Sequence, residues 1–99
     1  MVIEFIIKES AKHDVIEIVD WYDNKQLGRG DRFYNELLNE FEKIKQKPIL
    51  YSFYKKDFRR AILKHFPYLI IFKVTEIEII IYSVVYAGRN PELINKKID

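Results

Sequence analysis

The first part of the chain changes from the hydrophobic pattern of a strand to that of a helix. Segment 2–8 (VIEFIIK) is short and rich in β-branched residues, which predicts a strand. Ser10 follows and is a candidate helix N-cap, since a serine hydroxyl accepts hydrogen bonds from unpaired helix N–H groups. The stripe predicted to be buried in this helix is Ala11, Val15, Ile18 and Tyr22, with Glu17 and Asp20 facing outward.

A second amphipathic helix is predicted directly behind the first. Asp31 is its candidate cap, and the helix is expected to stop before Pro48, because the residue preceding a proline disfavours helical geometry. Gly28 and Gly30 mark a short connection between the two helices, which predicts an antiparallel helical hairpin. Its buried stripe is predicted as Phe33, Leu37, Phe41 and Ile44.

Beyond Pro48 the pattern becomes that of strands. Segments 58–66, 68–74 and 77–86 predict three successive antiparallel strands, with turns at Pro67 and at residues 75–76. In the tail, Asn90 is a candidate cap and Pro91 suits the first position of a short helix.

The order of these elements is βααβββ followed by a short C-terminal α. It predicts an α+β fold in which the helical hairpin packs on one face of a mainly antiparallel sheet. The other face of the sheet is expected to be free as a working surface.

Composition adds mainly exclusions. A chain of 99 residues, 48% hydrophobic and 32% charged, predicts a single globular domain over 1–99 and excludes intrinsic disorder. No apolar run approaches the roughly 18 residues of a membrane helix, and the N-terminal segment lacks the basic region of a signal peptide. We therefore expect a cytoplasmic protein with no membrane partner. The absence of cysteine excludes disulfides and thiolate chemistry.

The net charge of +2 is unevenly distributed. Residues 1–54 hold 8 basic and 10 acidic residues, a net charge of −2, whereas residues 55–99 hold 9 and 5, a net charge of +4. The second half therefore predicts a moderately basic surface that suits nucleic acid or an acidic partner.

Candidate chemistry is limited to that basic half. The chain has no phosphate-binding glycine motif, none of its three serines lies on a nucleophile elbow, and neither His13 nor His65 has the carboxylates of a metal site at a telling spacing. We expect neither a metal nor a cofactor. What remains is a basic and aromatic set: Arg59, Arg60, Lys64, His65, Tyr68, Tyr86 and Arg89.

Two interpretations of this set stay open. Arginines hold phosphate or carboxylate in a two-pronged fork, and neighbouring aromatic rings stack on bases. Alternatively, charged residues on a strand form its solvated face and discourage aggregation. Arg89 stands out because it occupies a defined corner between Gly88 and the Asn90-Pro91 pair. Trp21 is expected to be a core residue or a partner contact.

Five segments in order resemble one known family: AKHDVIEIVDWY, LGRGDRFYNELLNEFEKIKQKP, FRRAILKHF, PYLIIFKV and VVYAGRNP. Together they are similar to the RelE/ParE superfamily of toxins from type II toxin–antitoxin modules. The resemblance covers nearly the whole chain, and it implies the same βααβββ order. RelE-like members are ribosome-dependent ribonucleases that use basic side chains on the sheet, whereas ParE-like members inhibit DNA gyrase and have no assigned nuclease site.

The ribonuclease positions of this superfamily are only partly occupied. Arg60 and Arg89 match two basic positions, but the other two fall on Ile62 and Leu69. The histidine or tyrosine expected late in the tail has Asn95 as its nearest counterpart. Because each missing charge at a reacting phosphate costs several kcal/mol of transition-state stabilisation, these gaps weigh against RNA cleavage.

Other features resemble the ParE type. They are the Arg59-Arg60 pair, the turn at residues 66–68 and the corner at residues 89–91. One departure is Tyr86, where many ParE-type chains have histidine.

The resemblance therefore implies the toxin of a plasmid-stabilising module, which arrests growth by inhibiting DNA gyrase when free of an acidic antitoxin. We expect no enzyme activity on this interpretation. The alternative is a RelE-like ribonuclease acting on mRNA in the ribosome, with Arg60, His65 and Arg89 as candidate catalytic residues. A second alternative is a non-toxic module that only binds antitoxin. The target- or antitoxin-binding residues are expected to be Arg59, Arg60, Lys64, Tyr68, Tyr86 and Arg89.

Overall fold

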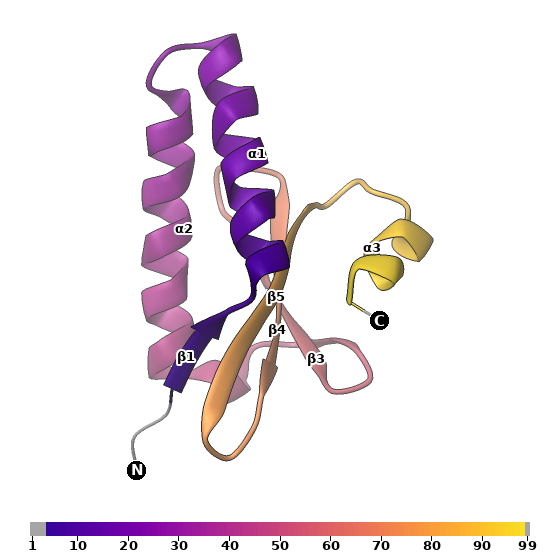
Figure 1. The fold of residues 1–99 in the computed structure, drawn as a ribbon. Helices are drawn as coiled ribbons and strands as arrows, with labels where there is room; N and C mark the ends of the chain where they lie inside the picture. The colour runs from indigo at the N-terminus through magenta and orange to yellow at the C-terminus, as the bar shows by residue number, and fades with distance from the viewer. Residues whose placement is uncertain (1–3, 99) are drawn as a thin grey trace.

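A helical hairpin and a short third helix lie on opposite sides of one sheet in the computed structural model, which describes residues 4–98 (Figure 1). The elements, in chain order, are β1 (Glu4–Ile7), α1 (Glu9–Lys25), α2 (Arg29–Gln46), the 3₁₀ helix η1 (Pro48–Leu50), β2 (Phe53–Lys55), β3 (Phe58–Ile62), β4 (Tyr68–Val74), β5 (Glu78–Tyr86) and α3 (Pro91–Ile98). The α+β class and the helical hairpin are confirmed.

Among residues 4–98 the sheet has five strands, in the order β1-β5-β4-β3-β2. Only β1 runs parallel to its neighbour β5, and the other three pairs are antiparallel, which confirms a mainly antiparallel sheet. The hairpin packs on one face of it and forms the main core. The predicted stripe of α2 is fully confirmed, whereas in α1 Val15 is only half-buried; the buried helix residues are Ala11, Ile18, Tyr22, Phe33, Leu37, Phe41 and Ile44.

The predicted caps of the first two helices are wrong. Helix α1 begins at Glu9, one residue before Ser10, and the Ser10 hydroxyl donates to the carbonyl oxygen of Tyr82 at 3.0 Å. Helix α2 begins at Arg29, and its N-cap is Gly28 with φ +87°, a left-handed conformation that glycine adopts without strain. Asp31 therefore lies inside the first turn, where its charge favours the helix dipole instead of capping it.

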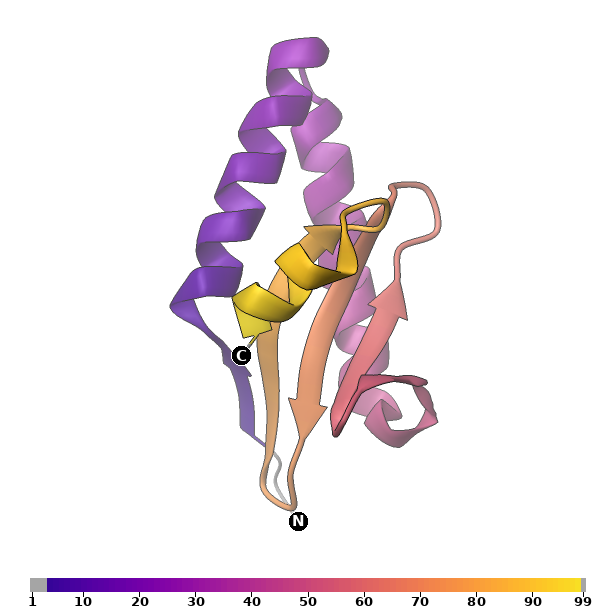
Figure 2. The ribbon, with the colours of Figure 1, turned by 90° about the vertical axis from the view of Figure 1, so that its right-hand side faces the viewer.

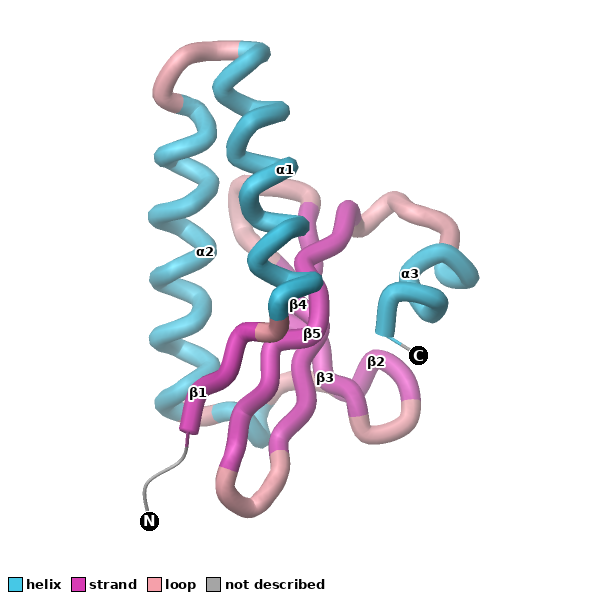
Figure 3. The backbone as a smooth tube through the Cα atoms, viewed as in Figure 1, coloured by secondary structure: helices cyan, strands magenta, loops and turns pink. Residues whose placement is uncertain are grey.

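The strand boundaries also differ from the prediction. Residues 2 and 3 of the first predicted strand lie outside the described residues. Strand β3 ends at Ile62 instead of residue 66, because the Leu63 N–H bonds to the carbonyl of Tyr68 and closes a turn. The short η1 and the edge strand β2 were not predicted (Figure 3). Strand β2 has only three residues and an irregular register with β3, so it is too short to produce a recognisable hydrophobic pattern.

The second face of the sheet is not free as predicted. Helix α3 lies across it, on the side away from the hairpin (Figure 2). Ile94 and Ile98 of α3 pack there against Leu69, Ile71 and Val85 in a second, smaller core. The Asn90 cap is confirmed, since its Oδ1 accepts the Glu92 N–H at 2.9 Å.

One buried carboxylate joins α1, β5 and α3. The register of β4 against β5 shifts between Ile71 and Phe72, so that Tyr82 is an extra residue in β5. Beside this bulge, Asp14 Oδ2 accepts the Ser83 hydroxyl at 2.7 Å and the Val84 N–H at 3.1 Å. Asp14 Oδ1 accepts Lys97 Nζ at 2.5 Å. Asp14 is 8% exposed, so its charge is compensated almost entirely by these three donors.

We expect Asp14→Ala to lower the free energy of unfolding by about 3 kcal/mol, because it leaves a buried hydroxyl, a buried N–H and an ammonium without their acceptor. Asp20→Ala, at an exposed position of the same helix, is the control and should change stability by less than about 0.5 kcal/mol. Chemical denaturation of both variants measures the difference. Equal stability of the two variants would contradict this role for Asp14.

Candidate functional site

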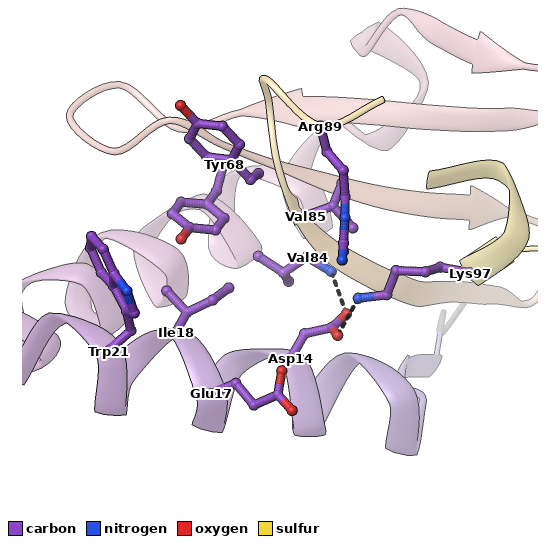
Figure 4. Close-up of a pocket in the computed structure, with 10 residues that line it drawn as sticks. Asp14, Glu17, Ile18, Trp21, Tyr68, Val84, Val85, Arg89 and Lys97 are labelled. Atoms are coloured by element: carbon purple, nitrogen blue, oxygen red, sulfur yellow. Dashed lines mark hydrogen bonds and ion pairs between the residues drawn. The ribbon is translucent and has the colours of Figure 1, made fainter. Parts of the chain in front are cut away.

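A groove of about 220 Å³ lies between α1 and the corner where β5 leads into α3 (Figure 4). Its floor is apolar and consists of Ile18, Val84 and Val85. Its remaining lining residues are aromatic or charged: Asp14, Glu17, Trp21, Tyr68, Tyr86, Arg89 and Lys97. The groove therefore combines an apolar base with charges of both signs at its rim.

Arg89 is the unpaired cation of this groove. The backbone fixes the corner it occupies, since the Arg89 N–H bonds to the carbonyl of Tyr86 at 3.0 Å and α3 begins two residues later. Within residues 4–98 its guanidinium makes no hydrogen bond or ion pair, whereas Lys97 is bound to Asp14. An unpaired guanidinium beside apolar surface is suited to a carboxylate or phosphate from a partner.

Two tyrosines, Tyr68 and Tyr86, line the groove, and a third, the buried Tyr22, packs behind Tyr68. Tyr68 packs edge-on against Tyr22 and Tyr86, with ring centroids 6.2 and 5.9 Å apart. Burial raises the pKa of Tyr68, and neighbouring Tyr22 raises it further; burial also raises the pKa of Tyr22. Both phenols therefore stay protonated at neutral pH and do not act as bases.

Gly88 fits closely against the exposed Tyr86 ring. A Cβ atom at Gly88 would lie 2.6 Å from the Tyr86 ring, so a side chain there forces the ring to move. The ring thus lies over the backbone of the corner that carries Arg89.

The structure brings together three of the predicted site residues, namely Tyr68, Tyr86 and Arg89. Arg59 and Arg60 lie elsewhere, on β3. Arg59 donates to the carbonyls of Ile49 and Tyr51 at 3.2 and 2.7 Å and stacks on the Phe53 ring, so it holds the edge of the sheet. Arg60 is exposed, on the strand face opposite Arg59.

Lys64 and His65 lie in the turn after β3 and also miss the groove. The His65 ring Nδ1 lies 2.7 Å from Glu36 Oε1, and the His65 N–H donates to Glu36 Oε2 at 2.9 Å. These contacts tie the turn to α2. Lys64 is exposed. The roles predicted for these residues stay predictions.

Sequence reasoning missed Asp14, Glu17 and Lys97 as groove residues and left Trp21 undecided. Trp21 is 53% exposed, unlike a core tryptophan. The signal available was spacing, since residues 14, 17, 18 and 21 share one side of a helix. That signal was masked because Ile18 also belongs to the predicted core stripe.

Residues 4–98 contain neither a metal-binding cluster nor a helix that could span a membrane. No cluster of three or more histidine and carboxylate side chains is arranged to hold a metal ion. No helix in that range has the length and apolar character to span a membrane.

Comparison with known proteins identifies a family and a structural neighbour with this fold. The family model described as the ParE toxin of the type II toxin–antitoxin system, parDE, matches residues 5–91. A solved structure, the chromosomal ParDE toxin–antitoxin system from P. aeruginosa, superposes with a TM-score of 0.79 at 15% sequence identity, covering 88% of this chain and 98% of that one. No curated protein matches. The structural similarity supports the fold, and the family match covers most of the chain.

The Glu36–His65 contact predicts a pH-dependent contribution to stability. Burial alone would raise the pKa of Glu36, but its bonds from His65 hold that pKa below the ordinary 4.5. A carboxyl with a lowered pKa stabilises the fold above its unfolded pKa, and the stabilisation is lost as the pH falls through the folded value. Glu36→Gln should therefore cost about 1 kcal/mol at pH 7, a modest figure because the His65 side chain is 70% exposed, and progressively less as the pH falls through the lowered pKa of Glu36.

Urea unfolding of both proteins from pH 3.5 to 7 measures this difference. Glu42→Gln, an exposed position on the same helix, provides the control. A stability difference for Glu36→Gln that stays constant across this range would contradict the assignment.

Proposed function

Because the chain belongs to the ParE toxin family of type II toxin–antitoxin systems, we propose that it arrests growth by inhibiting DNA gyrase when it is free of its antitoxin. The observation that carries the proposal is the groove beside Arg89, which has features of a recognition site. It offers an unpaired guanidinium, exposed aromatic rings and an apolar floor. Side chains of this kind supply most of the binding energy at protein interfaces.

Among the described residues, two potential proton acceptors of the groove, Asp14 and Tyr68, are not available for RNA cleavage. Asp14 already accepts three hydrogen bonds and is nearly buried. Burial raises the pKa of Tyr68, so this phenol remains protonated. Cleavage of a phosphodiester needs a positioned base and several cations around the phosphate, and this set of residues favours binding over cleavage.

The arrangement of the sheet also favours binding over RNA cleavage. Arg60, one of the two basic residues at ribonuclease-type positions, lies on β3, and β4 separates β3 from β5 and its Arg89 corner. Strands two apart are about 10 Å from each other, measured across the sheet. Between them, Leu69 is buried under α3 and Ile62 is apolar, so neither supplies the missing charge.

The family implies an antitoxin partner. We further propose that this antitoxin is acidic and contacts the basic second half of the chain, where residues 55–99 have a net charge of +4. The pair acts in the cytoplasm, where gyrase is found, and stabilises a plasmid that carries both genes.

Purified protein, gyrase and supercoiled plasmid test this proposal directly. We expect gyrase to accumulate on cleaved plasmid in the presence of ATP, and we expect addition of a ParD antitoxin that binds the chain to prevent it. Growth arrest with intact gyrase activity and cut messages in ribosomes would instead support the RelE-like ribonuclease. Antitoxin binding without growth arrest would support the non-toxic module.

Arg89→Ala should reduce gyrase inhibition at least tenfold, because it removes the groove's unpaired cation, while the fold stays intact. Arg32→Ala is the matched control: it removes an exposed arginine of α2, outside the groove, and should change inhibition less than twofold. The concentration that inhibits half of the supercoiling activity gives both values. Equal loss in the two variants would remove the groove from the proposal.

A further inference from the structure

A second surface lies on the outer side of the helical hairpin and is distinctly apolar. Ile16, Tyr34 and Leu38 are 60%, 44% and 40% exposed there. Two hollows of about 210 and 330 Å³ run between α1 and α2, and both are lined by Val15, Ile16 and Tyr34. They therefore form one continuous surface, which we call the hairpin face. Contiguous exposed apolar surface of this kind marks interaction sites.

The hairpin face is separate from the groove beside Arg89. The groove uses Asp14, Glu17, Ile18 and Trp21 of α1, whereas the hairpin face uses Lys12, Val15, Ile16, Val19 and Asp20. Because these two sets occupy different sides of one helix, a partner on either surface leaves the other accessible.

The two ends of the hairpin face carry charges of opposite sign. Lys12 is the charged lining residue of the first hollow, beside Leu38 and Phe41, where α1 begins and α2 nears its end. Asp20 and Asp31 are those of the second hollow, nearer the connection between the helices. Among the described residues the two aspartates have no hydrogen-bond or ion-pair partner through their side chains.

This pattern is complementary to itself. A two-fold axis through the centre of the face, near Ile16 and Tyr34, superposes the basic end of one copy on the acidic end of the other. Lys12 then lies opposite Asp20 and Asp31 of the second copy. In the single chain Lys12 Nζ lies 3.2 Å from Glu9 Oε1, but both side chains are at least 54% exposed. An exposed ion pair contributes little free energy, so Lys12 can leave Glu9 for a carboxylate of the second copy.

We propose that the hairpin face is a two-fold interface between two copies of this chain. Helix α1 has 17 residues, so the two packed helices present a face of about 26 by 18 Å, roughly 500 Å² per copy. The pair buries about 1,000 Å² in total, at the lower end for specific interfaces, and a dissociation constant in the micromolar range is expected. The Arg89 groove stays accessible in both the monomer and the dimer.

Sedimentation equilibrium of the purified chain between about 1 and 200 μM tests the proposal. The wild type should show a monomer–dimer equilibrium. Ile16→Glu should raise the dissociation constant at least tenfold, because it places a carboxylate at the centre of the interface. Ile49→Glu makes the same change at another exposed isoleucine, 68% exposed on η1, and should leave the equilibrium unchanged. A monomeric wild type at 200 μM overturns the proposal, as does an equal effect of both variants.

A charge exchange tests the orientation. Lys12→Glu and Asp20→Lys should each weaken self-association, since each places like charges opposite one another at two symmetric positions. An equimolar mixture of the two variants should associate at least fivefold more tightly than either alone, because one contact of the mixed dimer then pairs the unsubstituted Lys12 and Asp20 and the other pairs the two substituted residues with reversed sign. A mixture that associates no better than its components overturns the two-fold arrangement.

Discussion

The arrangement of the molecule depends on one buried carboxylate. Asp14 accepts hydrogen bonds from Ser83 and Val84 at the bulge of β5 and from Lys97 of α3, and so joins the two sides of the sheet. A bulge leaves backbone groups without partners in the sheet. Helix α1 supplies acceptors and donors for them, since Ser10 bonds to Tyr82 one turn before Asp14. The same carboxylate compensates the charge of Lys97, and with it α3 is held over the second face.

This constraint also shapes the groove. Arg89 lies between the strand and helix that Asp14 connects, and the groove's other cation, Lys97, is already paired. Among the described residues Arg89 is therefore the unpaired cation, in a groove that the exposed Trp21 and Tyr86 also line. Other charged residues with apparent functional potential hold the structure: Arg59 fixes the chain around η1, and His65 fixes the turn after β3 through Glu36. The charged residues in the second half of the chain thus divide into those that hold the structure and those that can bind a partner.

Helix α1 carries surfaces of different chemistry on its two flanks. One flank faces the polar and aromatic groove, and the other presents apolar side chains with opposite charges at its ends. For a toxin that pairs with an antitoxin, separate surfaces allow recognition and self-association to be controlled independently. Neither surface needs α3 to move.

The sequence by itself determined the α+β class, the helical hairpin, the buried stripe of α2 and the antiparallel strands, because these follow from local hydrophobic periodicity. It also named Tyr68, Tyr86 and Arg89 as candidate binding residues, and Arg89 stood out because it lies at the corner between Gly88 and the Asn90-Pro91 pair. It did not reveal the Asp14 contacts, which join residues 69 to 83 positions apart, or the covering of the second face by α3.

Tertiary structure decided which basic side chains are available. Arg59 and Arg89 are both candidate binding residues in the sequence, yet within residues 4–98 one is bound to backbone carbonyls and the other is unpaired. Whether a charge has a partner depends on what packing brings to it from distant parts of the chain, and no local pattern records that.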